Sequence, residues 1–275
     1  MSQNIIIQKV IFAGAGPGDP ELVTLKTVRC LQEAEVVITD RLVSDEILVN
    51  HVHPNALVLH AGKQRHQSGS TPQYIINELL VEYALQGKKV VRLKGGDVSV
   101  FSNLLDELQA LNKYQIPYEI IPGITAACGA AAYAGIPLTA RDHARSVRFL
   151  TLHQQETILP EYWRELALSE DTLVFYMSGE TISGLVSELL DKGIDPSKYV
   201  AVIEQATTPL QKVYTCPIGR FFAEFGSRFY VSPTLIIVGK VAGLHSELKW
   251  KKESRTEGEL YFKPVTKNKE EEVRA

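Results

Sequence analysis

The chain has 275 residues, of which 45% are hydrophobic and 22% charged, and its formal net charge at pH 7 is −3. This composition is typical of a globular protein with enough length for one large core or two smaller ones. The small net charge provides no general attraction for nucleic acid or an anionic membrane, and no apolar run is as long as a membrane helix. The three cysteines are widely spaced, which predicts neither a disulfide framework nor a metal site, and no signal peptide is apparent, so we expect a cytoplasmic protein.

The hydrophobic residues within 5–12 are mostly β-branched or aromatic, which predicts a buried strand of a parallel sheet. Gly14 and Gly16 then predict a tight turn. The turn resembles a dinucleotide-binding loop, but Asp19 occupies the third glycine position and Pro17 has no N–H to offer a phosphate. We therefore exclude a dinucleotide fingerprint and keep two interpretations, a rigid ligand-binding turn and a plain strand-to-helix turn.

The next residues, Asp19-Pro20-Glu21, are typical of a helix start, and Leu22, Leu25 and Val28 follow at helical spacing. Strand-like and helix-like segments then alternate, which predicts a parallel sheet covered on both faces. The other predicted strands of this half are Val36–Thr39, Leu57–His60, Val90–Lys94 and Tyr118–Ile121, and its other predicted helices open at Thr71-Pro72 or span about 103–113 and 124–134.

The second half shows the same alternation. Its predicted strands are 148–153, 173–177, Tyr199–Glu204, 213–215 and Thr234–Gly239, and its clearest helix spans 181–192. We infer an α/β protein whose two α/β domains, over 1–143 and 144–245, are joined near residue 145. Residues 246–275 mix charges of both signs with few apolar side chains, which predicts a disordered tail.

A second glycine turn, Gly95-Gly96-Asp97, follows the predicted strand at Val90–Lys94. Two glycines at the carboxyl end of a strand allow a ligand to lie directly on the backbone, and the aspartate could accept hydrogen bonds from ribose hydroxyls or an amine. Because ligands bind at this edge in open α/β sheets, two such turns indicate one shared crevice. A turn without a ligand is the alternative interpretation.

Eight short motifs follow one another along the chain. They are Gly-Ala-Gly-Pro-Gly-Asp-Pro at 14–20, Thr-Asp-Arg-Leu-Val at 39–43, Leu-Lys-Gly-Gly-Asp at 93–97, Pro-Gly-Ile-Thr-Ala at 122–126, Ala-Ala-Tyr-Ala-Gly-Ile-Pro-Leu-Thr at 131–139, Val-Phe-Tyr-Met at 174–177, Thr-Thr-Pro at 207–209 and Ser-Pro-Thr-Leu-Ile-Ile-Val-Gly at 232–239. In this order, over about residues 8–243, the chain resembles the tetrapyrrole methylases, most closely the members that methylate uroporphyrinogen III at carbon.

The resemblance implies two α/β domains with a cleft between them for S-adenosylmethionine, a homodimer, and two methyl transfers to uroporphyrinogen III, through precorrin-1 to precorrin-2, for sirohaem or cobalamin. It implies acid–base roles for Asp40 and Lys63, and substrate binding by Arg41 and Arg141, to which we add Arg145. The cofactor contacts that it implies are Pro17, Gly95, Gly96, Asp97, Val100, Thr125, Ala126, Met177 and Ala206.

The residue types suit this chemistry. The methyl group of a sulfonium is already electrophilic, so the protein mainly aligns the acceptor and excludes water. A base such as Asp40 could take up the displaced proton, and a substrate that carries carboxylates needs arginines. The chain departs from the family pattern at Asn103, where an arginine is usual, and at Leu104 and Leu105, where glycines are usual, which predicts a helix that starts at once. We expect Arg65, Arg145 and Arg148 to substitute for the missing arginine.

Two alternatives remain open at this point. The chain could methylate a later corrin intermediate or another substrate of related methylases. It could also be a relative that binds S-adenosylmethionine without catalysis. The presence of Asp40, Lys63 and Arg141 favours the active enzyme.

Overall fold

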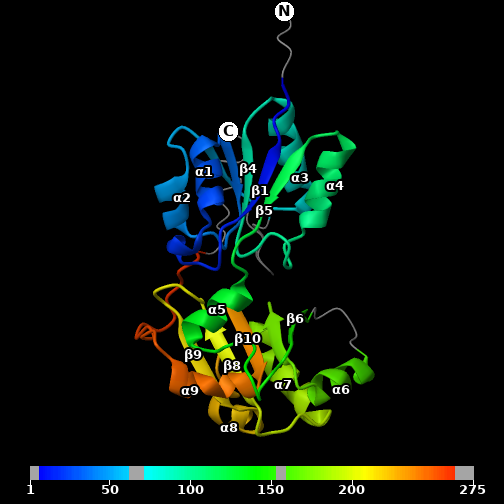
Figure 1. Cartoon of the computed structure of the whole chain (residues 1–275), viewed down its shortest axis with the longest axis vertical. Helices are drawn as coiled ribbons and strands as arrows, with labels where there is room; N and C mark the ends of the chain where they lie inside the picture. The colour runs from blue at the N-terminus through cyan, green and yellow to red at the C-terminus, as the bar shows by residue number, and fades with distance from the viewer. Residues whose placement is uncertain (1–5, 62–70, 153–158, 264–275) are drawn as a thin grey trace, which may run out of the picture. The chain divides into compact units, whose positions relative to one another are not determined.

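The computed structural model describes residues 6–61, 71–152 and 159–263. By its internal contacts the chain divides into two compact units (Figure 1). Unit 1 comprises residues 1–125 and 262–275, and unit 2 comprises residues 126–261. The chain therefore enters unit 2 once and returns from it once.

Unit 1 contains a five-stranded parallel sheet in the order β3-β2-β4-β1-β5. The strands are β1 (Val10–Gly14), β2 (Val36–Thr39), β3 (Leu57–His60), β4 (Val90–Lys94) and β5 (Tyr118–Ile121). The last four have the predicted bounds, because each is a short run rich in apolar residues between more polar segments.

Helices cover both faces of this sheet: α1 (Leu25–Glu33) and α2 (Asp45–His51) one face, α3 (Gln73–Leu85) and α4 (Leu104–Lys113) the other (Figure 1). Successive strand residues alternate between the two faces, as the period of a strand requires. Thus Val91 and Leu93 pack with Leu31 of α1, while Val90 packs with Leu80 of α3. Arg92 and Lys94 follow the alternation of Val90, so their side chains belong to the face of α4.

Unit 2 contains a mixed sheet in the order β6-β7-β10-β8-β9. Its strands are β6 (Val147–Thr151), β7 (Thr172–Tyr176), β8 (Tyr199–Glu204), β9 (Lys212–Pro217) and β10 (Thr234–Gly239). β6 and β7 are parallel, whereas β10 is antiparallel to both β7 and β8. β7 and β8 therefore run in the same direction, and their carboxyl ends lie at the same edge of the sheet.

The helices of unit 2 also cover both faces of its sheet. They are α5 (Ala126–Ala134), α6 (Pro160–Leu168), α7 (Ile182–Asp191), α8 (Phe221–Phe225) and α9 (His245–Leu248). The buried alanines of α5 pack on one face with Val174 and Ile237, and α6, α7 and α8 pack on the other. The small residues of α5 thus serve close packing of a helix on a sheet, one of the roles that such a composition suggests.

The unit boundary differs from the predicted junction near residue 145. The change between units falls at Thr125 and Ala126, because α5 packs on the sheet of unit 2. The predicted disorder after residue 245 is wrong for the described part of that segment. The Trp250 indole donates a hydrogen bond to the Ala132 carbonyl at 2.8 Å, and its ring meets that of Tyr133 edge to face. Phe262 is buried.

The predicted start of the chain is also partly wrong. β1 begins at Val10, and Ile6 and Ile7 are exposed. Asp19-Pro20-Glu21 forms a short 3₁₀ turn at Pro20–Leu22, and the helix proper begins after Thr24, whose side chain caps Thr27 N. Leu25 is therefore exposed. In the described residues, no helix is both long and apolar enough to cross a membrane.

Candidate active site

The carboxyl ends of the five parallel strands of unit 1 lie at one edge of their sheet. The central strands β4 and β1 are neighbours, and the chain leaves them in opposite directions along the sheet, β1 toward β2 and β4 toward β5. Such a switch point is where open α/β sheets bind ligands. The turns after β1 and β4, both singled out in the sequence, therefore lie side by side at the expected place.

The backbones of these two turns are in direct contact. Gly16 N donates to Gly96 O at 3.1 Å, and Gly96 N donates to Gly16 O at 2.7 Å. A Cβ on Gly14 would lie 2.6 Å from Gly123 Cα, and one on Gly123 would lie 2.4 Å from Gly96 O. These glycines are required by the approach of three backbone segments to one another.

Asp97 belongs to the same framework. Its Oδ2 accepts a hydrogen bond from Gly123 N at 2.9 Å, and its Oδ1 accepts from Ser99 N at 2.8 Å and from the Ser99 hydroxyl. The carboxylate thus ties the turn after β4 to the turn after β5. Asp97 thus lies at the carboxyl edge of the sheet, where its hydrogen bonds hold the two turns together.

The edge is poorly suited to a phosphate group. The amides of Gly16, Gly96 and Gly123 all donate to protein acceptors, and Pro17 has no N–H. A phosphate cradle requires several amides directed at the ligand. The arrangement agrees with the exclusion of a dinucleotide fingerprint from the sequence.

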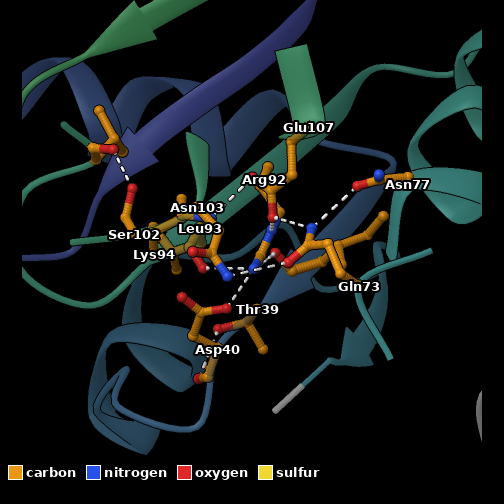
Figure 2. Close-up of polar contacts among 12 residues, drawn as sticks. Thr39, Asp40, Gln73, Asn77, Arg92, Leu93, Lys94, Ser102, Asn103 and Glu107 are labelled. Carbon is orange, nitrogen blue, oxygen red and sulfur yellow. Dashed lines mark hydrogen bonds and ion pairs between the residues drawn. The ribbon is translucent and has the colours of Figure 1, made fainter. Parts of the chain in front are cut away.

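Asp40 follows β2 at this edge and is held by a buried arginine (Figure 2). Arg92 on β4 pairs with Asp40 Oδ1 through Nη2 and with Glu107 Oε1 through Nε at 3.1 Å. Its Nη1 donates to Ile38 O at 3.2 Å and to Leu93 O at 3.3 Å. The paired carboxylates raise the pKa of Arg92 although burial, the largest influence, lowers it.

Lys94 completes the group of charges. Its Nζ lies 2.8 Å from Glu107 Oε2, and both side chains are almost completely buried. Burial, together with the positive charge of Arg92, lowers the pKa of Lys94. Gln73 Nε2 donates to Glu107 Oε1 at 3.4 Å, and Asn103 Nδ2 donates to Gln73 Oε1 at 3.5 Å (Figure 2). The position that departs from the family pattern thus lies at the margin of this group, and α4 begins directly after it, as predicted.

The sequence analysis missed Arg92, Lys94 and Glu107 as site residues. A signal was nevertheless present. Arg92 and Lys94 stand on one face of a strand whose other residues are all apolar, and Glu107 shares the helical spacing of Leu104, Leu108 and Leu111. Charges of opposite sign on two core-facing stripes predict a buried ion pair, since such charges are rarely buried unless paired.

The predicted substrate-binding residue Arg41 follows Asp40 directly in the chain. Arg41 is partly buried, its Nε is shielded from solvent without a hydrogen-bond partner in the described parts of the chain, and burial lowers its pKa. A buried donor without a partner is costly, so Arg41 is suited to an anionic ligand. Lys63, Arg65 and His66 lie outside the described residues.

In unit 2, Met177 and Ala206 lie at the carboxyl ends of β7 and β8. Met177 follows β7 with φ +54°, and Gln205 and Thr207, which flank Ala206 after β8, have φ +46° and +67°. Side chains other than glycine seldom adopt this left-handed conformation, and such residues gather at functional sites. Met177 is 53% exposed, so its side chain is accessible to a ligand. The edge therefore has the character of a binding surface.

Hydrogen bonds hold the turn around Ala206 in its strained conformation. Gln205 N donates to Pro233 O at 2.8 Å, and Thr207 N donates to Gln211 Oε1 at 2.7 Å. The Gln205 side chain also donates to Glu259 O at 2.9 Å and accepts from Tyr261 N at 2.7 Å. Beside Met177, the Tyr176 hydroxyl accepts from Ala127 N at 3.0 Å, which brings the start of α5, and so Ala126, to the same edge.

The predicted substrate arginines of unit 2 differ in their availability. Arg141 and Arg145 are exposed in the turn closed by the Ala140–Ala144 bridge, and neither guanidinium pairs with another described residue. Arg148 pairs with Asp171 at 2.6 Å and with Glu165, which together raise its pKa. The expectation that Arg148 is available for a substrate is therefore wrong, because two carboxylates already hold it.

An open pocket of about 710 Å³ lies at the opposite, amino edge of the first sheet. It is lined by the starts of β2 and β3, and its lysines already pair with carboxylates: Lys88 with Glu35 at 3.0 Å and Lys89 with Glu33 at 3.4 Å. Within unit 1, the contacting glycine turns, Asp40 and the shielded Arg41 Nε lie at the carboxyl edge and not at this pocket, which favours the carboxyl edge as the candidate site. The described residues contain no cluster of His, Cys, Asp and Glu able to hold a metal ion.

The comparison with known protein families decides the assignment. Residues 9–221 match the family described as Tetrapyrrole (Corrin/Porphyrin) Methylases. The chain belongs to this family. The tetrapyrrole methylase assignment confirms the resemblance found in the motifs, and the two-sheet α/β architecture agrees with it.

Individual tetrapyrrole methylases are also similar to this chain. A siroheme synthase of Saccharophagus degradans is 43% identical over 244 residues, which cover 89% of this chain and 53% of that protein. The chain thus spans about half the length of the curated relatives it matches.

Two solved structures match this chain over most of their own length. A uroporphyrin-III-C-methyltransferase from Thermus thermophilus is 35% identical with a TM-score of 0.74, over 90% of this chain and 99% of that one. A structure of the T. thermophilus enzyme complexed with S-adenyl homocysteine is 32% identical with a TM-score of 0.71, over 85% of this chain and 93% of that one.

Proposed function

We propose that this chain is an S-adenosylmethionine-dependent methyltransferase that methylates uroporphyrinogen III twice, giving precorrin-2. One observation carries the proposal. The chain matches nearly the whole length of a uroporphyrin-III-C-methyltransferase, and it places an aspartate with an available carboxylate oxygen at the carboxyl edge of the corresponding sheet. The product serves siroheme synthesis in this proposal, as the names of the curated relatives suggest.

The residues fit S-adenosylmethionine, which when bound supplies an electrophilic methyl group on a sulfonium. We assign Pro17, Gly95, Gly96, Asp97, Val100 and Thr125 of unit 1, and Ala126, Met177 and Ala206 of unit 2, as its contacts. The donor chemistry supports a cofactor without phosphate, since the amides of Gly16, Gly96 and Gly123 already donate to protein acceptors. The exposed, left-handed Met177 supports a contact with an apolar or sulfonium group in unit 2.

The acid–base chemistry rests on Asp40. Each methyl transfer would form a carbon–carbon bond at the macrocycle while the sulfur–methyl bond of the bound cofactor breaks to leave a thioether, and the macrocycle must then lose a proton. Asp40 is 30% exposed and uses Oδ1 for Arg92, so Oδ2 is able to accept this proton or stabilise the positive charge before its loss. Lys63 is the second acid–base residue of the proposal. Arg41, Arg141 and Arg145 bind the carboxylates of the substrate.

The decisive experiment incubates the purified chain with uroporphyrinogen III and methyl-labelled S-adenosylmethionine under anaerobic conditions. The expected product carries two new methyl groups by mass. No methylated product, with the cofactor still bound by calorimetry, would indicate a non-catalytic relative. Methylation of a later corrin intermediate in its place would assign the chain to another step.

We further propose a homodimer in the cytoplasm. The three cysteines are free, which supports a reducing compartment. Light scattering of the purified protein is expected to give twice the mass of 30.6 kDa. A monomer at micromolar concentration would refute the dimer without affecting the chemistry.

A further inference from the structure

The charged group under the carboxyl edge of unit 1 reaches solvent at one end. The side chains of Arg92, Lys94 and Glu107 are 2%, 1% and 0% exposed, whereas that of Asp40 is 30% exposed. Two cations and two carboxylates balance one another. Asp40 is thus the member of this group that a substrate can reach.

Stability alone does not explain such a group. Each buried charge loses its hydration, and buried ion pairs are often no more stabilising than apolar side chains of the same volume. The surrounding core of β4, α3 and α4 is apolar and could have been completed with apolar residues. A role in fixing the orientation of a functional side chain accounts for the charges.

Arg92 has the geometry for that role. Its guanidinium is rigid and planar, and three hydrogen bonds fix two of its nitrogens. Nε donates to Glu107 Oε1 at 3.1 Å, and Nη1 donates to Ile38 O at 3.2 Å and to Leu93 O at 3.3 Å. The remaining nitrogen, Nη2, is thereby aimed at Asp40 Oδ1 (Figure 2). Within the described residues, Asp40 Oδ2 accepts no hydrogen bond, so it is available to a ligand.

Glu107 fixes the arginine in turn. Its two oxygens divide between Arg92 and Lys94, and it projects from α4 while both cations stand on β4. Lys94 Nζ lies 2.8 Å from Glu107 Oε2, and in the described residues no hydrogen bond or ion pair joins Lys94 to Asp40, so the charge of Lys94 balances Glu107 without holding the aspartate. The chain of contacts therefore runs from Glu107 through Arg92 to Asp40.

We propose that Arg92, fixed by Glu107, is a positioning residue that holds Asp40 with its second carboxylate oxygen toward the acceptor carbon. This inference rests on the proposed methyltransferase function. Arg92 itself touches neither substrate nor cofactor, because it is buried beneath the edge. Its whole effect on turnover must pass through Asp40.

The test is a double-mutant cycle with Asp40→Asn and Arg92→Lys in the full chain, measured as kcat for uroporphyrinogen III. Asp40→Asn is expected to lower kcat on the order of 10²-fold or more. Arg92→Lys keeps the charge but loses the fork, and a misplaced catalytic group costs on the order of 10- to 10²-fold. Since Arg92 acts through Asp40, the double variant should have the kcat of Asp40→Asn within about twofold.

Affinity for S-adenosylhomocysteine, measured by calorimetry, should not change in any of the three variants. Lys198→Met is the control for disruption of a buried ion pair away from the proposed site. Lys198 pairs with Glu170 at 3.0 Å and lies at the start of β8, at the edge of unit 2 opposite to Met177, so its removal should lower the melting temperature without lowering kcat. If Arg92→Lys does not fold, Glu107→Gln replaces it in the double-mutant cycle.

The inference would be overturned if the loss of kcat in the double variant equalled the product of the losses in the two single variants. A loss of cofactor affinity that parallels the loss of kcat would also overturn it. Wild-type turnover in Asp40→Asn would also overturn it, because there would be nothing to position. An inactive wild-type chain would instead overturn the proposed function, and with it the inference, and is recognised before any variant is measured.

Discussion

At the scale of single residues, the glycines of the carboxyl edge of unit 1 have a structural cause. Gly14, Gly96 and Gly123 bring three turns into backbone contact, and Asp97 holds two of these turns by hydrogen bonds. The requirement comes from packing between segments far apart in the sequence. Gly96 and Asp97 are also among the residues that we assign to the cofactor, so we expect stability and binding to be coupled there.

Gly123→Ala tests this coupling. The new Cβ would lie 2.4 Å from Gly96 O and 2.8 Å from Gly14 Cα, so backbone must move. Overpacking of this kind costs about 1–3 kcal/mol. We expect a lower melting temperature and weaker cofactor binding by calorimetry. Gly184→Ala is the control, because it lies in α7 with nothing within 4 Å and should stabilise by roughly 0.5–1 kcal/mol. Equal effects of the two changes would contradict the packing argument.

Arg145 and Arg148 form a second residue-scale pair. Arg145 is exposed without a described partner, whereas Arg148 is held by Asp171 and Glu165. Arg145→Ala should raise the Michaelis constant for uroporphyrinogen III, since a charge-assisted contact contributes roughly 1.5–3 kcal/mol, and should leave cofactor affinity unchanged. Arg148→Ala should lower the melting temperature with little change in that constant. The reverse result would show that the wrong arginine was assigned to the substrate.

At the scale of elements, strands were predicted better than helix ends. β2, β3, β4, β5, β8 and β10 have their predicted bounds, and β2, β4, β5 and β10 end at or next to an aspartate, glycine or proline that marks the turn. The first helix was misplaced because Asp19 caps a single 3₁₀ turn and Thr24 caps the helix. Which of two caps is used depends on how the chain packs, and a local pattern does not contain that information.

The candidate site was predictable only in part, for a related reason. The turns at Gly14–Gly16 and Gly95–Asp97 could be placed at one edge because parallel strands share their carboxyl end. The pairing of Arg92 with Asp40 could not, since it depends on β2 and β4 being neighbours although β3 lies between them in the sequence. Strand order is a property of the whole sheet.

The end of β8 provides an element-scale prediction of pH dependence. Glu204 is buried, accepts a hydrogen bond from Val231 N at 2.7 Å and lies near Tyr214, Arg228 and Lys212. Burial raises the pKa of Glu204 above its usual value. The folded state therefore keeps a proton that the unfolded chain has already lost, so the free energy of unfolding decreases as pH rises through this window.

Glu204→Gln removes the titratable carboxyl group, so it should remove this contribution to the pH dependence of the free energy of unfolding. Relative to the wild type, the variant should gain stability in urea titrations as the pH rises above the usual glutamate pKa of 4.5. Asp195→Asn should instead lose stability relative to the wild type as the pH rises toward 3.8, because hydrogen bonds from Ser197 lower the pKa of Asp195. A stability difference between Glu204→Gln and the wild type that stays constant above pH 4.5 would refute the assignment for Glu204.

At the scale of the whole molecule, the chain enters unit 2 at Ala126 and leaves it after Tyr261. The segment from His245 to Tyr261 is part of the folded unit. A backbone carbonyl of this segment, Leu248 O, would lie 2.3 Å from a Cβ on Gly135, and Ser254 N donates to Gln211 O at 3.2 Å. Charged composition thus concealed an ordered segment, because a few residues such as Trp250 anchor it.

Truncation after residue 245 tests this account. The chain over residues 1–245 should lose the contacts of Trp250, Ser254, Glu259 and Tyr261, and unit 2 should unfold at a lower temperature. A chain over residues 1–263 keeps these contacts and serves as the control. Calorimetric scans measure both. Identical scans would mean that the segment contributes nothing and that the original prediction of a disordered tail was adequate.

The hydrogen bonds from Gln205 to Glu259 and Tyr261 have a practical consequence. One side chain joins the turn that carries Ala206 to a segment rich in trypsin sites, among them Lys251, Lys252 and Arg255. A ligand that binds the turn in its hydrogen-bonded conformation also disfavours the opening that exposes these sites, by an amount that grows with the ratio of ligand concentration to dissociation constant. If the proposed cofactor contact at Ala206 is correct, S-adenosylmethionine should slow tryptic cleavage after residue 250. The measurement needs neither substrate nor turnover, so it also applies to catalytically inactive variants.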